Sequence, residues 1–192
     1  CGVEYPKSVY STGGRFNDDG VAETPDTQVA TFEFETMLMT FCLTLDTPYM
    51  LKSDAVLRDS DMFPHWPQNA TRIEIFGTRG VMFVGRHGGG WQVFARPKDR
   101  KPQVAEQQYG RFPDPEHKQD FVDAIRNNRH PNADIEEGQR STLLAHTANI
   151  SLRLGGEKLL LDAKTERFTN SDAGNAMLKR AYREPWVVPD QV

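Results

Sequence analysis

The sequence predicts an α+β domain: an open, mostly antiparallel β-sheet with helices packed on one face. Three observations lead to this class. Short runs rich in β-branched and aromatic residues fill the first half of the chain, helical periodicity begins only after them, and strands and helices do not alternate regularly. All residues from 1 to 192 are expected to form this single domain.

The first half of the chain supplies most of the expected strands. QVATFEFE is followed almost at once by MLMTFCLTL, which predicts a hairpin around Glu35 to Met37. RIEIFG, VMFVG and WQVFAR are further short runs of strand-forming residues. Together with EKLLLDA, the expected strands cover residues 7–13, 27–35, 37–46, 71–77, 80–85, 91–96 and 157–162.

Glycines are concentrated between residues 72 and 94, which raises the question of a nucleotide site. A dinucleotide cradle requires Gly-x-Gly-x-x-Gly between a strand and a helix, whose N-terminus faces the pyrophosphate. No glycine triplet of this chain has that spacing, and the segments after GTRG and GRHGGG are strand-like. The glycines therefore predict hairpin turns, and no cofactor-binding residue is assigned in this chain.

Helical periodicity begins in DPEHKQDFVDAIRNNRHP, where Pro115 suits a first helical turn. The next apolar period ends at Gly155 and Gly156, which predict a C-cap. A last helix would begin after Ser171 or Asp172 as the N-cap. The three helices are expected at residues 115–128, 136–154 and 173–182.

Composition excludes several classes of function. The net charge of −4 argues against a nucleic-acid-binding protein, which needs a basic face. The short basic cluster of Arg96, Lys98, Arg100 and Lys101 is interpreted as a solvated loop. No apolar stretch is long enough to cross a bilayer. The chain starts without Met, so whether the protein is cytoplasmic or exported cannot be read from it.

The cysteines and histidines indicate no metal site. Cys42 lies in an apolar run and is expected to be a small buried hydrophobe, and Cys1 is the only other cysteine. The five histidines are scattered without the spacing of metal ligands.

Candidate ligand contacts lie in two connecting segments. The long segment SDAVLRDSDMFPHWPQN contains Arg58, His65 and Trp66, whose aromatic rings and hydrogen-bond donors could contact a substrate. The turn GGRFNDDG offers Arg15 near a strand end, with Asp18 beside it. The alternative for both segments is a surface connection without a ligand.

Several segments in order resemble the C-terminal domain of the glucose–fructose oxidoreductase, inositol dehydrogenase and rhizopine-catabolism family (Gfo/Idh/MocA). The segments of the first half are YPKSVYSTGGRF, TPDTQVATFEF and IFGTRGVMFV. Those of the second half are FVDAIRNNRHPNADIEEGQRS, LLAHTANISLRLGGEKLLLD and NAMLKRAYREPW. Each segment is weak alone, and the likeness rests on their order and spacing.

The resemblance implies a parent oxidoreductase that uses NAD or NADP and acts on a sugar or sugar derivative. In this family a separate N-terminal Rossmann domain binds the cofactor. The C-terminal domain supplies a wall of the substrate site and a broad sheet that usually packs against another subunit. A lysine of a Glu-Lys-Pro segment and an Asp-x-x-x-His pair carry the chemistry.

This chain lacks Glu-Lys-Pro and the glycine fingerprint, so the Rossmann domain and the catalytic His helix are expected to be absent from it. Asp61 and His65 have the right spacing, but prolines break their segment, so the two side chains would not share a helix face. The isolated chain is therefore expected to be inactive, with no catalytic residue assigned.

Two alternatives stay open: a stand-alone carbohydrate-binding or assembly domain, and part of a relative that uses nicotinamide transiently to cleave glycosidic bonds.

In the strand after the hairpin, Phe41 and its alternate neighbours point one way, while Leu38 and Cys42 point the other. A sheet apolar on both faces predicts a homo-oligomer, and Phe41→Glu is the substitution expected to dissociate it.

Overall fold

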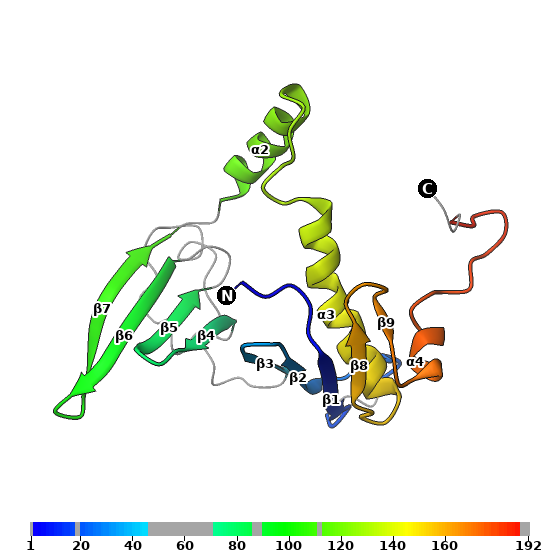
Figure 1. Cartoon of the computed structure of the whole chain (residues 1–192), viewed down its shortest axis with the longest axis horizontal. Helices are drawn as coiled ribbons and strands as arrows, with labels where there is room; N and C mark the ends of the chain where they lie inside the picture. The colour runs from blue at the N-terminus through cyan, green and yellow to red at the C-terminus, as the bar shows by residue number, and fades with distance from the viewer. Residues whose placement is uncertain (1, 18–19, 46–70, 86–89, 111–112, 189–192) are drawn as a thin grey trace. The chain divides into compact units, whose positions relative to one another are not determined.

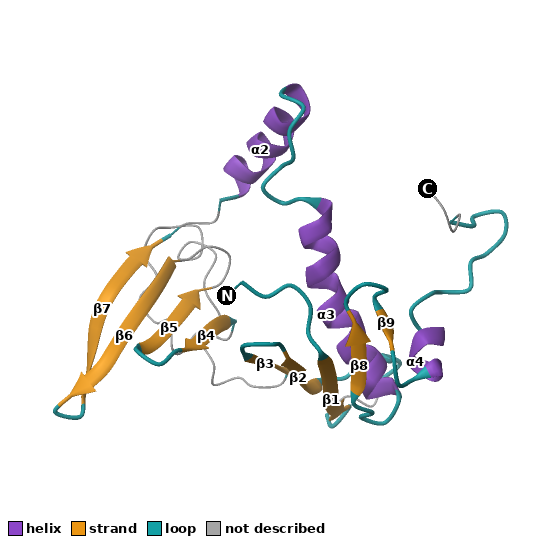
Figure 2. Cartoon of the chain, in the orientation of Figure 1, coloured by secondary structure: helices purple, strands orange, loops and turns teal. Residues whose placement is uncertain are grey.

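The structure is a computed structural model of the chain, and it describes residues 2–17, 20–45, 71–85, 90–110 and 113–188. The chain divides into two compact units, Cys1–Asp46 with Asp134–Val192, and Thr47–Ala133. Each unit contains one antiparallel sheet (Figure 1, Figure 2). The α+β class with mostly antiparallel strands is therefore confirmed, but the strands form two sheets where one was expected.

The first unit carries a five-stranded sheet in the order β3-β2-β1-β8-β9. The predicted hairpin between β2 and β3 is confirmed, and the Phe34 N–H donates to the Met37 carbonyl at 2.9 Å where the chain reverses. The strands are β1 (Ser8–Gly14), β2 (Thr27–Glu33), β3 (Leu38–Thr44), β8 (Leu159–Asp162) and β9 (Arg167–Phe168).

Helix α3 (Ile135–Arg153) packs on one face of this sheet, mainly against β1. It begins at Asp134, whose Oδ1 accepts the Glu136 N–H at 2.9 Å. It ends before Gly155 and Gly156, both at positive φ, so the predicted C-cap is confirmed. The core between helix and sheet consists of Val9, Ala30, Phe32, Phe34, Leu143, Ala148, Ile150, Leu159, Leu161 and Phe168.

Alternation along the strands separates the covered face from an outer face. Phe41 pairs with the buried Ala30 and so lies on the side of the sheet that α3 covers. Cys42 pairs with Val29 on the opposite side, and both are exposed. The expectation of a buried Cys42 is therefore wrong, because β3 is the edge strand and this position faces outward. The exposed large hydrophobic residues on the outer face are Tyr10, Val29, Leu38 and Leu160.

The second unit carries a four-stranded sheet in the order β4-β5-β6-β7. Strand β7 was not predicted. Its residues 103–109 are exposed, so they need not follow the alternating apolar pattern of a half-buried strand. The basic cluster assigned to a loop lies instead in the β6–β7 hairpin, where Lys98 pairs with Lys101. The strands are β4 (Arg72–Phe76), β5 (Gly80–Gly85), β6 (Gly90–Lys98) and β7 (Lys101–Tyr109).

The glycine-rich segments join antiparallel strands, as predicted. The Gly77 N–H donates to the Gly80 carbonyl at 2.9 Å in the turn between β4 and β5. Residues 86–89 lie outside the described part, but the strands on either side of them are antiparallel, with Val84 opposite Trp91. These glycines therefore do not stand between a strand and a helix, as a phosphate cradle would require.

Two further helices are described. Helix α2 (Asp114–Arg126) begins with Pro115 in its first turn and ends close to the expected boundary. Helix α4 (Asp172–Ala176) is much shorter than expected, although the predicted cap is present: Ser171 Oγ accepts the Gly174 N–H at 3.1 Å. Gly174 and Asn175 are weak helix formers. The Asn175 side chain also forms two hydrogen bonds with the Phe168 backbone.

Candidate functional site

Polar side chains line the contact between β1, β2 and α3 in the first unit. The Ser11 N–H donates to Ser151 Oγ at 2.9 Å, and Ser151 Oγ donates to the Glu157 carbonyl at 2.7 Å. Gln28 Nε2 donates to Ser11 Oγ at 2.9 Å and to Asn149 Oδ1 at 3.5 Å. Because these groups satisfy one another, the contact is a structural joint between helix and sheet.

Two polar residues of α3, Asn149 and His146, differ in their surroundings. Asn149 accepts the bond from Gln28, which is the helix–sheet hydrogen bonding expected of this residue type at such a contact. His146 lies on the same helix and is exposed. The other described histidines, His117 and His130, are exposed as well.

Arg15 lies in the connection between β1 and β2, and its guanidinium is held by that connection. Its Nη2 donates to the Gly20 carbonyl at 2.9 Å, and its Nη1 donates to the Ala22 carbonyl. Nearby, Asp26 Oδ2 accepts the N–H groups of Phe16 at 2.7 Å and Asn17 at 2.8 Å. The structure thus gives Arg15 a role in shaping the turn, while a contact of Arg15 with a ligand stays a prediction.

A second polar cluster connects the start of the chain with the β8–β9 turn. The Tyr5 hydroxyl donates to Glu166 Oε1 at 2.8 Å, and Gln139 Nε2 donates to Glu166 Oε2 at 3.0 Å. The bond to the Glu166 carboxylate raises the pKa of Tyr5. A tyrosine that accepts a proton in catalysis needs a lowered pKa, so Tyr5 holds its proton and serves as a donor. The nearby Tyr5 hydroxyl raises the pKa of Arg140.

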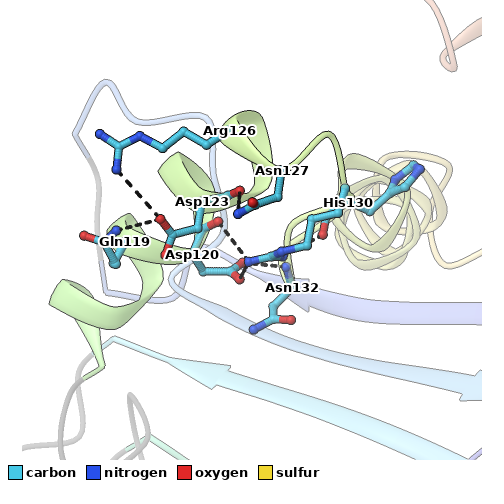
Figure 3. A network of polar contacts seen from close by, with 8 residues as sticks. Gln119, Asp120, Asp123, Arg126, Asn127, His130 and Asn132 are labelled. Carbon is cyan, nitrogen blue, oxygen red and sulfur yellow. Dashed lines mark hydrogen bonds and ion pairs between the residues drawn. The ribbon is translucent and has the colours of Figure 1, made fainter.

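In the second unit, polar contacts tie the segment that follows α2 back to that helix (Figure 3). Asp120 accepts the Asn132 N–H at 2.7 Å and an Arg129 Nη2–H at 2.6 Å. These two bonds, the backbone one first, lower the pKa of Asp120. Asp123 accepts from Gln119 Nε2 at 2.9 Å on the same helix. The arrangement fixes the path of the chain after the helix and leaves Asp120 ionised.

Neither the Tyr5–Glu166 cluster nor the Asp120 cluster was predicted from the sequence. Tyr5 and Glu166 are 161 residues apart, and no sequence pattern relates them. The Asp120 contacts span at most a dozen residues, but they depend on the path of an irregular segment. The other candidate contacts, Arg58, His65 and Trp66, lie outside the described residues, as does the Asp61–His65 pair.

Two kinds of site are absent from the described ranges. Within them no three His, Cys, Asp or Glu side chains are placed to hold a metal ion. In the same part of the chain, every helix is too short or too polar to span a bilayer. The polar clusters described above position backbone and side chains.

Comparison with known proteins identifies the domain type. Residues 81–188 match the family model "Oxidoreductase family, C-terminal alpha/beta domain". A search of curated sequences finds no significant match.

Similar solved structures come from several bacteria. A protein from Thermotoga maritima classed as an oxidoreductase is 19% identical, with a TM-score of 0.55, over 83% of this chain and 42% of its own. The YvaA protein of Bacillus subtilis, classed likewise, is 15% identical with a TM-score of 0.55, over 82% of this chain and 47% of its own. The Bordetella pertussis dehydrogenase WlbA, solved with NADH and UDP-GlcNAcA, is 19% identical with a TM-score of 0.46, over 82% and 39%.

The chain therefore spans less than half the length of each of these structures. At these identities the first two show a shared fold. The family is shown by the matched model, which covers more than half of the chain. This protein belongs to the Gfo/Idh/MocA oxidoreductase family, and its sequence carries the C-terminal α/β domain of that family.

Proposed function

We propose that this chain is the substrate-wall and assembly domain of an NAD- or NADP-dependent oxidoreductase acting on a sugar or sugar derivative. The observation that carries the proposal is the match of residues 81–188 to the C-terminal domain of an oxidoreductase family. The likeness to less than half of each larger oxidoreductase supports it, because a second part of those proteins has no counterpart here.

The chemistry of such an enzyme divides between domains. Oxidation of an alcohol removes a hydride from the carbinol carbon and a proton from the hydroxyl, so it needs a nicotinamide acceptor and a base. A domain without either can still supply hydrogen-bond donors, acceptors and ring faces that orient a sugar. The candidate contacts Arg15, Arg58, His65 and Trp66 are of these types.

Assembly is proposed for the outer face of the first unit's sheet. Tyr10, Val29, Leu38 and Leu160 are exposed there beside Cys42. The face that α3 covers is already used in the core. A self-complementary sheet face that buries about 800 Å² on each copy is the size of a typical specific interface. The partner proposed for this face is a second copy of the chain.

Sugar binding is testable with the 192-residue chain. Saturation-transfer NMR with a panel of monosaccharides and sugar acids would show signals from those that the wall contacts. Paired substitutions His65→Ala and Trp66→Ala should remove the signals, whereas Trp186→Ala, at an exposed tryptophan of the C-terminal segment, should retain them. Equal signals in all variants would contradict the assignment of the wall.

A further inference from the structure

An apolar groove lies at one end of the four-stranded sheet, within the second unit. It has a volume of about 490 Å³, within the range of small-molecule sites. Its aromatic lining comes from Phe76, Phe83 and Phe94, the last two packed edge to face with ring centres 5.8 Å apart. Phe76 is 77% exposed, which is unusual for a large aromatic side chain.

Two arginines also line this groove. The register that pairs Gly80 with Ala95 brings the adjacent residues, Arg79 and Arg96, to the same end of β5 and β6. Among the described residues neither guanidinium has a hydrogen bond or an ion pair. The nearest acid in that part of the sequence is Asp99, in the β6–β7 turn, which has no described partner either.

This arrangement of charges destabilises the sheet, and within the described part of the chain no hydrogen bond or ion pair of the two arginines offsets the repulsion. Like charges brought together at neighbouring strands are destabilising, and Lys98 opposite Lys101 adds two more cations at the same end of the sheet. The chain as a whole is acidic, with a net charge of −4. Positions where a sequence breaks a local rule without compensation are frequently functional. An anion held between the two guanidinium groups would relieve the repulsion.

We infer that the groove binds a small organic anion in which a planar apolar ring carries a carboxylate. The ring would lie against Phe76 and Phe94, where aromatic faces favour offset or edge contacts. The carboxylate would accept from Arg79 and Arg96, since the guanidinium fork matches carboxylate geometry. This site is built from residues other than the candidate sugar contacts and does not depend on the proposed function.

Benzoate is the simplest probe of this chemistry, with acetate as the anion alone and benzyl alcohol as the ring alone. Calorimetric titration of the full chain at low salt should give an affinity for benzoate at least about tenfold higher than for either fragment. The affinity should fall as salt is raised. Equal affinity for benzoate and acetate would overturn the inference, because the aromatic lining would then contribute nothing.

Variants separate the two halves of the site. Arg79→Gln with Arg96→Gln should weaken benzoate binding by about tenfold or more, while Phe76→Ala, at an exposed position, should weaken it without unfolding the chain. Arg153→Gln with Arg180→Gln removes the same charge from exposed positions in the first unit and should leave binding unchanged. If the two double variants weaken binding equally, general electrostatic attraction explains the data and the site is refuted.

Discussion

The backbone N–H of Ser11 in β1 donates to Ser151 Oγ in α3 at 2.9 Å, and both residues are fully buried. The two residues lie 140 positions apart, so this bond links β1 to α3, the longest of the described helices. Ser151 Oγ in turn donates a hydrogen bond to the Glu157 carbonyl at 2.7 Å. One hydroxyl thus satisfies a donor in the sheet and an acceptor beyond the helix.

Ser151→Ala should destabilise the first unit. It leaves a buried N–H and a backbone carbonyl without their partner, which costs about 1–3 kcal/mol. Urea unfolding followed by circular dichroism would measure the loss. Ser141→Ala, which removes an exposed hydroxyl from the same helix, is the control and should change the free energy of unfolding by less than about 0.5 kcal/mol.

Two Gly→Ala substitutions should have opposite signs. A Cβ at Gly80 would overlap the Phe94 carbonyl oxygen of the neighbouring strand, so Gly80→Ala should destabilise the second sheet by about 1–3 kcal/mol. A Cβ at Gly138 meets nothing within 4 Å, and this residue lies in α3. Gly138→Ala should therefore stabilise by up to about 1 kcal/mol. Thermal unfolding of both variants tests the pair, and a loss of stability in both would contradict the helix assignment.

Asp120 should make stability depend on acid pH. Its pKa is lower in the folded chain than in the unfolded one because it accepts from Asn132 and Arg129. Its contribution is therefore present above the unfolded pKa of about 4 and is lost as the pH falls through the folded pKa. Asp120→Asn should be less stable at neutral pH and should lose less stability on acidification.

A carbon-detected NMR titration of the Asp120 carboxyl would check the same point directly. Arg129→Gln removes the smaller of the two hydrogen-bond contributions and keeps the Asn132 bond, so the pKa of Asp120 should rise only part of the way toward its ordinary value. An ordinary pKa in the unmodified chain would refute the contacts shown in Figure 3.

The isolated chain should not reduce NAD or NADP with any sugar. Hydride transfer needs a bound nicotinamide and a base, and the sequence has neither the glycine fingerprint nor Glu-Lys-Pro. Absorbance of the reduced cofactor would be followed with the purified chain, with an intact sugar dehydrogenase as the positive control. Sustained reduction by the pure chain would contradict this expectation and show that the chain itself carries the catalytic groups.

Hairpin and helix positions could be predicted because their signals are local. The alternating residues of QVATFEFE and the proline of α2 act within a few positions, and the structure confirms both elements. Strand β7 could not, because an exposed edge strand needs no apolar alternation. The division into two sheets depends on which strands become neighbours, and local pattern carries no information about pairing partners.

The candidate site was harder to predict for a related reason. Arg15 could be placed near a strand end, but its carbonyl partners depend on the exact path of the turn. Arg79 and Arg96 are distant in sequence, and only the strand register that pairs Gly80 with Ala95 brings them close together. Register also changes the choice of interface variant, since Phe41 lies on the face that α3 covers and Val29 lies on the outer face.

Sedimentation tests the proposed assembly role of this domain most directly. At micromolar concentration the chain should sediment as a dimer or larger species, and Val29→Glu, which puts a charge in the outer face, should convert it to a monomer. Val21→Glu makes the same change at a fully exposed position between β1 and β2 and should leave the oligomer intact. A 21.8 kDa monomer at every concentration of the unmodified chain, or equal dissociation by both variants, would contradict assembly through this face.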